Sequence, residues 1–158
     1  MSTEREIPEY AKPALYVGAI ILSFLAAILT FVAEFGWWRT IYSWGYDFAL
    51  YGEFVEAYGK IALVILGLGF LAVAFLALQQ LYPILRVSDE VHRKLERAGF
   101  FLAISMVVLT IIITIVFVAQ VSDATDWDLG TSFYSGMFGG LLSALFFWLA
   151  RRIKKPAK

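Results

Sequence analysis

Four long apolar runs, none with Asp, Glu, Lys or Arg in its middle, constrain the fold of this chain more than any other feature. An α-helix rises about 1.5 Å per residue, so about 20 residues cross the roughly 30 Å of hydrocarbon in a bilayer. A charge at the centre of such a span would cost about 2.5–3.5 kcal/mol. We therefore expect four transmembrane helices, at about residues 15–35, 61–81, 99–121 and 133–153.

The composition indicates that lipid is the solvent for much of the surface. Of the 158 residues, 61% are hydrophobic and 16% are charged, whereas soluble domains average about 45–50% and about 25%. We expect one all-α integral membrane domain over residues 1–158, a four-helix bundle in a cell membrane, and no cleaved signal peptide. Cys and Asn are absent, which favours a thermophilic source because both residues degrade at high temperature.

The basic residues predict how the bundle is oriented. Only two of the 13 Lys and Arg residues, Arg39 and Lys60, lie in the connections that follow the first and the third run. The other basic residues lie at the opposite ends of the runs. The positive-inside rule then places both termini, the loop 84–98 and the basic tail 151–158 in the cytoplasm. In that loop, Ser88 is a predicted helix N-cap, so a short helix is expected to continue into the third span.

The outer segment 36–59 has nine aromatic residues, which is unlike a solvated loop. Its apolar positions recur at spacings of four and three, the pattern of an amphipathic helix of about five to six turns. We therefore predict such a helix, and the same spacing disfavours extended strands. The stripe consists of Trp37, Ile41, Trp44, Phe48, Tyr51, Val55 and Tyr58.

Two interpretations of this outer segment compete. Its rings could lie at headgroup depth as a membrane anchor, or they could form a docking surface for a protein, because Trp and Tyr dominate interface hot spots. The candidate interface or anchor residues are Trp37, Trp38, Trp44, Phe48, Tyr51 and Tyr58. A long aromatic first outer loop followed by a short second one is similar in layout to claudin-like tetraspan proteins, whose paired loop cysteines this chain lacks.

Candidate reactive groups are few. The only histidine, His92, lies in the cytoplasmic loop, so a bis-His haem is excluded within the chain and no haem or other cofactor is expected. Asp123, Asp126 and Asp128 match no known metal-binding pattern and indicate an acidic turn. Glu34 and Lys60, at the outer ends of two spans, are predicted to form an ion pair or to anchor the spans at the headgroups.

Small residues indicate where helices approach closely. Gly136 and Gly140 form a GxxxG pair in the fourth span, and Gly67 lies in the second. Such residues allow close backbone contact where lipid provides no hydrophobic drive for association. The contact is expected either inside the bundle or with another subunit.

These features favour a non-catalytic structural or accessory subunit of a membrane assembly, either a homo-oligomer or a multi-subunit complex. It would dock through small-residue helix faces and the aromatic outer loop. A small oligomeric transporter or channel is the first alternative, and a quinone- or lipid-binding subunit of a respiratory-type complex is the second. The expected partners are membrane lipid and other subunits or further copies of the chain, with no nucleic acid.

The predicted orientation is directly testable. A tag after Arg151 and a tag in the loop near Arg93 should both be protected from protease in intact cells, and both should be cleaved once the membrane is opened. Cleavage of only one of the two tags in intact cells would contradict an even number of spans between them.

Overall fold

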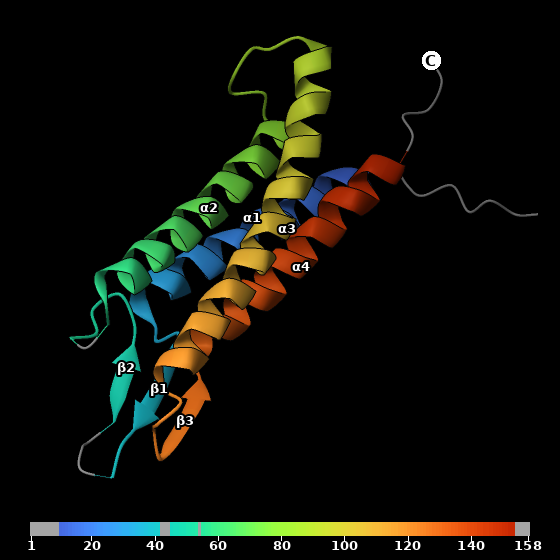
Figure 1. Cartoon of the computed structure of the whole chain (residues 1–158). Helices are drawn as coiled ribbons and strands as arrows, with labels where there is room; N and C mark the ends of the chain where they lie inside the picture. Colours follow the sequence, from blue (N-terminus) through green and yellow to red (C-terminus); the bar gives the residue numbers. More distant parts are fainter. Residues whose placement is uncertain (1–9, 42–44, 54, 154–158) are drawn as a thin grey trace, which may run out of the picture.

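The computed structural model is built on four long helices that lie side by side (Figure 1). It describes residues 10–41, 45–53 and 55–153. All four helices are long and apolar enough to cross a membrane, as predicted. They are α1 (Ala11–Val32), α2 (Ala57–Leu81), α3 (Asp89–Gln120) and α4 (Thr131–Arg152).

The helices form a four-membered ring of contacts. Helix α1 packs against α2 and α4, and α3 packs against the same two neighbours. The start of α1, the α2–α3 loop and the end of α4 therefore lie at one end of the bundle, here called the terminal end. The α1–α2 and α3–α4 connections lie at the other end, the sheet end (Figure 1).

Helix α3 begins ten residues before the predicted span. The Ser88 hydroxyl accepts a hydrogen bond of 3.5 Å from the Val91 backbone N–H, which confirms the predicted N-cap. Asp89 and Glu90 occupy the first turn, where negative charge complements the helix dipole.

Helices α1 and α4 meet along a seam of small residues. An added Cβ at Gly139 would lie only 2.8 Å from the Ala26 Cβ atom. The two helices therefore approach so closely here that a side chain at position 139 would clash with Ala26. Within the seam, the Ser23 and Ser143 hydroxyl oxygens are 2.8 Å apart and hydrogen-bonded. The seam includes Ala19, Ser23 and Ala26 on α1, with Gly139 and Ser143 on α4.

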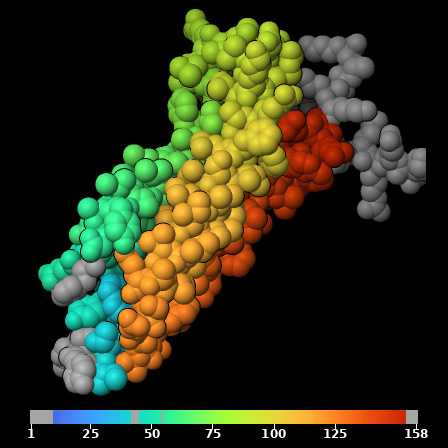
Figure 2. All heavy atoms as spheres, viewed as in Figure 1, coloured from blue at the N-terminus to red at the C-terminus, as the bar shows by residue number. Residues whose placement is uncertain are grey.

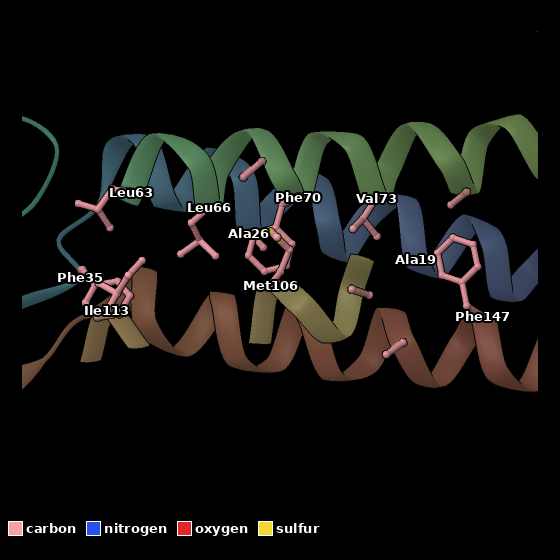
Figure 3. Close-up of a cluster of buried hydrophobic side chains, with 14 of the residues drawn as sticks. Ala19, Ala26, Phe35, Leu63, Leu66, Phe70, Val73, Met106, Ile113 and Phe147 are labelled. Carbon is pink, nitrogen blue, oxygen red and sulfur yellow. The ribbon is translucent and has the colours of Figure 1, made fainter. Parts of the chain in front are cut away.

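Larger side chains fill the space on the α2 side of the bundle. Figure 3 shows Phe70 of α2 beside Met106 of α3, with Leu63, Leu66 and Val73 pointing inward from the same face of α2. These side chains are almost fully buried.

The three glycines singled out in the sequence all face the interior of this chain. An added Cβ at Gly136 would meet the Thr110 hydroxyl at 2.9 Å, and one at Gly140 would meet Val107 Cγ2 at 2.5 Å, both on α3. At Gly67 it would lie 2.4 Å from the Phe31 ring of α1. Their missing side chains are therefore used for packing between helices of the bundle.

The sheet end differs from the prediction. In place of a helix over 36–59, the chain forms strands β1 (Gly36–Arg39) and β2 (Tyr46–Phe48), and α2 begins only at Ala57. Strand β3 (Asp126–Leu129) completes an antiparallel sheet in the order β2-β1-β3. The fold is mostly helical rather than all-α. The predicted outer helix is wrong because β1 pairs on one edge with β2 and on the other with β3, which lies in the other connection about 90 residues away, and no local spacing reveals that partner.

The packing at Gly140 predicts a large effect of added volume. Gly140→Leu should destabilise the bundle by about 1–3 kcal/mol, because the new side chain must displace Val107 and the α3 backbone. Chemical unfolding in detergent, followed by circular dichroism, measures this effect.

Ser105→Leu is the matched control, since Ser105 is an exposed small residue of α3. Equal stability of the Gly140→Leu and Ser105→Leu proteins would contradict the packing described above.

Candidate functional site

The sheet is fastened to the bundle by a cluster of aromatic rings. Phe117, fully buried near the end of α3, lies at the centre of this cluster. Its ring centroid is 5.3 Å from that of Phe48, 6.3 Å from that of Trp38 and 6.1 Å from that of Trp127, so it contacts all three strands. Edge-to-face contacts of this kind add to the free energy gained from burial.

A glycine allows β1 to lie directly on this cluster. An added Cβ at Gly36 would lie 2.7 Å from the Phe117 ring, so any other residue here would push the strand away. On the neighbouring position, the buried Phe35 ring contacts Phe48 at 6.1 Å and Phe133 of α4 at 5.9 Å between centroids. The cluster therefore joins β1 and β2 to both α3 and α4.

Backbone hydrogen bonds continue the sheet up to the helices. The Phe35 N–H donates to the Phe48 carbonyl at 2.8 Å, and the Gly130 N–H donates to the Phe35 carbonyl at 2.8 Å. The Ser132 N–H, in the first turn of α4, donates to the Glu34 carbonyl at 2.9 Å. The chain after α1 thereby satisfies a free amide at the start of α4.

Strand alternation divides the sheet into two faces. Because Gly36 and Trp38 pack on Phe117, the residues between and after them, Trp37 and Arg39, belong to the opposite face. Trp37 pairs with Asp47 on β2 and with Asp128 on β3, and Arg39 pairs with Asp126. We call this the acidic sheet face, formed by Trp37, Arg39, Asp47, Asp126 and Asp128.

This face offers one large ring between carboxylates. Arg39 and Asp126 form an exposed ion pair at 3.6 Å, which leaves Asp47 and Asp128 on either side of Trp37. The Asp128 carboxylate accepts a hydrogen bond of 2.7 Å from the Leu129 N–H. The arrangement suits contact with a surface that carries both apolar and basic groups.

The candidate interface or anchor residues do not share one surface. Trp37 lies on the acidic sheet face, whereas Trp38 and Phe48 belong to the ring cluster. Tyr51 and Tyr58 lie outside the strands and are 57% and 53% exposed. Trp44 lies outside the described residues. The stripe was predicted with a helical period, but the strands place neighbouring residues on opposite faces.

The two exposed tyrosines have polar neighbours. Tyr58 shares a hydrogen bond with the Gln120 amide, which links the start of α2 to the end of α3. Desolvation by burial and the negative charges of Asp47 and Glu34 raise the pKa of the Tyr51 phenol.

Glu34 and Lys60 do not pair. The ion pairs of the described residues are Lys12–Glu96, Arg39–Asp126 and Lys94–Glu90. The Glu34 carboxylate instead accepts a hydrogen bond of 3.5 Å from the Thr131 hydroxyl at the start of α4. Within the described part of the chain, no three His, Cys, Asp or Glu residues are grouped so that they could hold a metal ion.

Sequence reasoning missed a buried polar cluster at the terminal end. Glu96 of α3 accepts a hydrogen bond from the Tyr16 hydroxyl of α1 and forms an ion pair of 3.2 Å with Lys12. The Tyr16 ring also meets Phe147 of α4 edge-on, at 5.7 Å between centroids. No local signal identifies this cluster, because the partners of Glu96 lie about 80 residues earlier in the chain.

Comparisons with family models, curated proteins and solved structures found no match for this chain. The similarity to claudin-like proteins therefore remains one of layout.

The ring cluster predicts that the sheet depends on Phe117. Phe117→Ala should cost about 3–5 kcal/mol, because it leaves a cavity beneath all three strands. Hydrogen exchange at the amides of β1 should become faster by several orders of magnitude, whereas the middle of α1 should stay protected.

Phe101→Ala is the control for this substitution, because Phe101 is an exposed ring on the same helix. Unchanged protection of β1 in Phe117→Ala would show that the sheet is held by other contacts.

Proposed function

We propose that this protein is a non-catalytic accessory subunit of a membrane assembly and that it docks a partner protein on its acidic sheet face. The observation that carries this proposal is the division of the sheet. One face is fixed to the bundle through Phe117, and the other presents Trp37 between Asp47 and Asp128. A rigid Trp next to charged groups is typical of interface hot spots.

The proposed membrane orientation puts this face outside the cell. The terminal end carries the basic residues Arg86, Arg93, Arg97, Arg151 and Arg152, which the positive-inside rule assigns to the cytoplasm. The sheet end would then lie on the outer side of the membrane.

The helices themselves support docking by the sheet rather than by the spans. The glycines that could bring another helix close are used inside the bundle, at Gly67, Gly136 and Gly140. The outward positions carry large apolar side chains such as Phe24, Ile65 and Phe138. Such a surface suits lipid, which requires no close backbone approach.

Five hydroxyl groups within the helices support a structural role for the interior. The Thr30, Thr110 and Thr114 hydroxyls donate to the carbonyl four residues earlier, at 2.7, 2.8 and 2.8 Å. The Ser23 and Ser143 hydroxyls bond to each other across the seam. Polar groups that are satisfied in this way stabilise helix contacts and leave few partners for a transported ion.

The acidic sheet face suggests the chemistry of the partner. Asp47 and Asp128 have no basic cross-strand neighbour on this face, since Arg39 pairs with Asp126. A partner surface with Lys or Arg around an apolar patch would complement both the carboxylates and the Trp37 ring.

The test is a substitution in the acidic sheet face that leaves the ring cluster intact. Trp37→Ala should release the copurifying partner, with a loss of at least about 2 kcal/mol, or roughly 30-fold in affinity. Asp47→Asn with Asp128→Asn should weaken binding further at low salt. Affinity purification in mild detergent followed by mass spectrometry measures both effects.

Trp148→Ala is the matched control, because Trp148 is also partly exposed but lies near the opposite end of the bundle. Retention of every partner by a protein with all three substitutions, Trp37→Ala, Asp47→Asn and Asp128→Asn, would refute docking on this face, provided that β1 is still protected from hydrogen exchange. Ion flux into liposomes that contain this protein alone would refute the accessory role itself.

A further inference from the structure

The loop between α2 and α3 is held in a defined shape by one buried side chain. Gln79, fully buried near the end of α2, donates from its amide nitrogen to the Leu85 carbonyl at 2.8 Å. Its amide oxygen accepts from the Leu85 N–H at 3.0 Å. This pair of hydrogen bonds closes the loop over six residues and satisfies the amide group at both its ends.

Several of the side chains that the fixed loop exposes are apolar, beside the exposed polar residues of the segment 86–90. Tyr82, Ile84 and Leu85 are 68%, 56% and 49% exposed, and Val87 and Val91 are exposed beside them. Figure 2 shows this loop and the start of α3 as a projection at the end of the bundle opposite the sheet. An ordered loop that exposes this much apolar surface indicates a binding surface.

The position of the loop indicates what covers it. The Gln80 side-chain amide donates to the His92 carbonyl at 3.5 Å, so the last turn of α2 lies beside the first turns of α3. In the chain, the exposed loop residues follow directly after the apolar run of α2, which ends at Leu81. A span of this length ends at the boundary between hydrocarbon and headgroups, which places the loop at headgroup depth.

A second marker of this boundary lies on α4. Trp148 is partly exposed, and the Arg152 guanidinium carbon lies 4.9 Å from the centroid of its ring. A Trp stacked with Arg one turn later is typical of a membrane interface.

The charges around the loop favour an anionic surface. Glu90 is paired with Lys94 at 2.6 Å, and Glu96 is paired with Lys12. Arg86, Arg93 and Arg97 are exposed, and no carboxylate of the described residues lies within 4.0 Å of them. Arg93 and Arg97 are one turn apart on α3, so both guanidinium groups can reach the same side of the helix.

We propose that the α2–α3 loop and the start of α3 form a binding surface for anionic phospholipid. Ile84 and Leu85 insert among the acyl chains near the headgroups, and the three arginines bind the lipid phosphates. A guanidinium group matches a phosphate group through two parallel hydrogen bonds, which add geometric specificity to the attraction between the charges. This surface is separate from the acidic sheet face and does not depend on the accessory function.

Replacement of the three arginines tests the proposal in the full chain. Purified protein in mild detergent is titrated with phosphatidylglycerol or phosphatidylcholine, and bound lipids are counted by native mass spectrometry. The wild-type protein should prefer phosphatidylglycerol. The triple variant Arg86→Gln, Arg93→Gln, Arg97→Gln should lose about fivefold in affinity per arginine, on the order of a hundredfold in total.

Lys60→Gln is the control, because Lys60 is a partly exposed basic residue at the sheet end that lies outside the acidic sheet face, and it should leave the preference at the terminal end unchanged. The circular dichroism spectrum of the triple variant should equal that of the wild type, since the three arginine side chains are exposed. Equal retention of phosphatidylglycerol by the triple variant and the wild type would overturn the proposal.

A single labelled cysteine gives an independent measurement, because the chain has no Cys. A fluorophore on Ile84→Cys should be shielded from a water-soluble quencher in nanodiscs that contain phosphatidylglycerol, and less shielded in phosphatidylcholine alone. Equal quenching in both lipids would overturn the proposal, as would shielding that requires an added protein partner.

Discussion

Close contact between α1 and α4 sets the positions of the other elements. Lipid does not drive apolar helices together, so the contact depends on backbones that approach closely and on polar groups that meet across the seam. Gly139 against Ala26 provides the first, and Ser23 with Ser143 provides the second. Helices α2 and α3 then close the ring with larger side chains such as Phe70 and Met106.

Each end of the bundle is closed by a different chemistry. At the sheet end, the Phe117 ring holds three short strands that could not be stable alone, because their free face is small and partly acidic. At the terminal end, Glu96 joins α1 and α3 through Lys12 and Tyr16. The apolar middle of the bundle depends on neither the ring cluster nor the polar cluster around Glu96. Both ends present groups suited to contacts outside the chain.

The four helices could be predicted from the sequence, but the sheet and the cluster around Glu96 could not. A span is recognised from consecutive apolar residues, and the Ser88 cap is also a local signal. Strand β1 depends on partners in two separate connections, with Trp38 opposite both Tyr46 and Trp127. Spacings of three and four between aromatic residues fit a helix, but hydrogen bonds to a distant strand outweighed that local pattern.

The sequence by itself determined how many apolar helices the chain forms and which connections share an end, because both follow from composition and from the parity of the spans. Only the tertiary structure decided which residues are buried and which are presented. It turned Gly136 and Gly140 towards α3, placed Trp38 on the sheet face that packs on Phe117 and Trp37 on the opposite face, and fixed the α2–α3 loop through Gln79. The physical reason is that these contacts join residues that are far apart in the chain or fix a direction that composition does not encode.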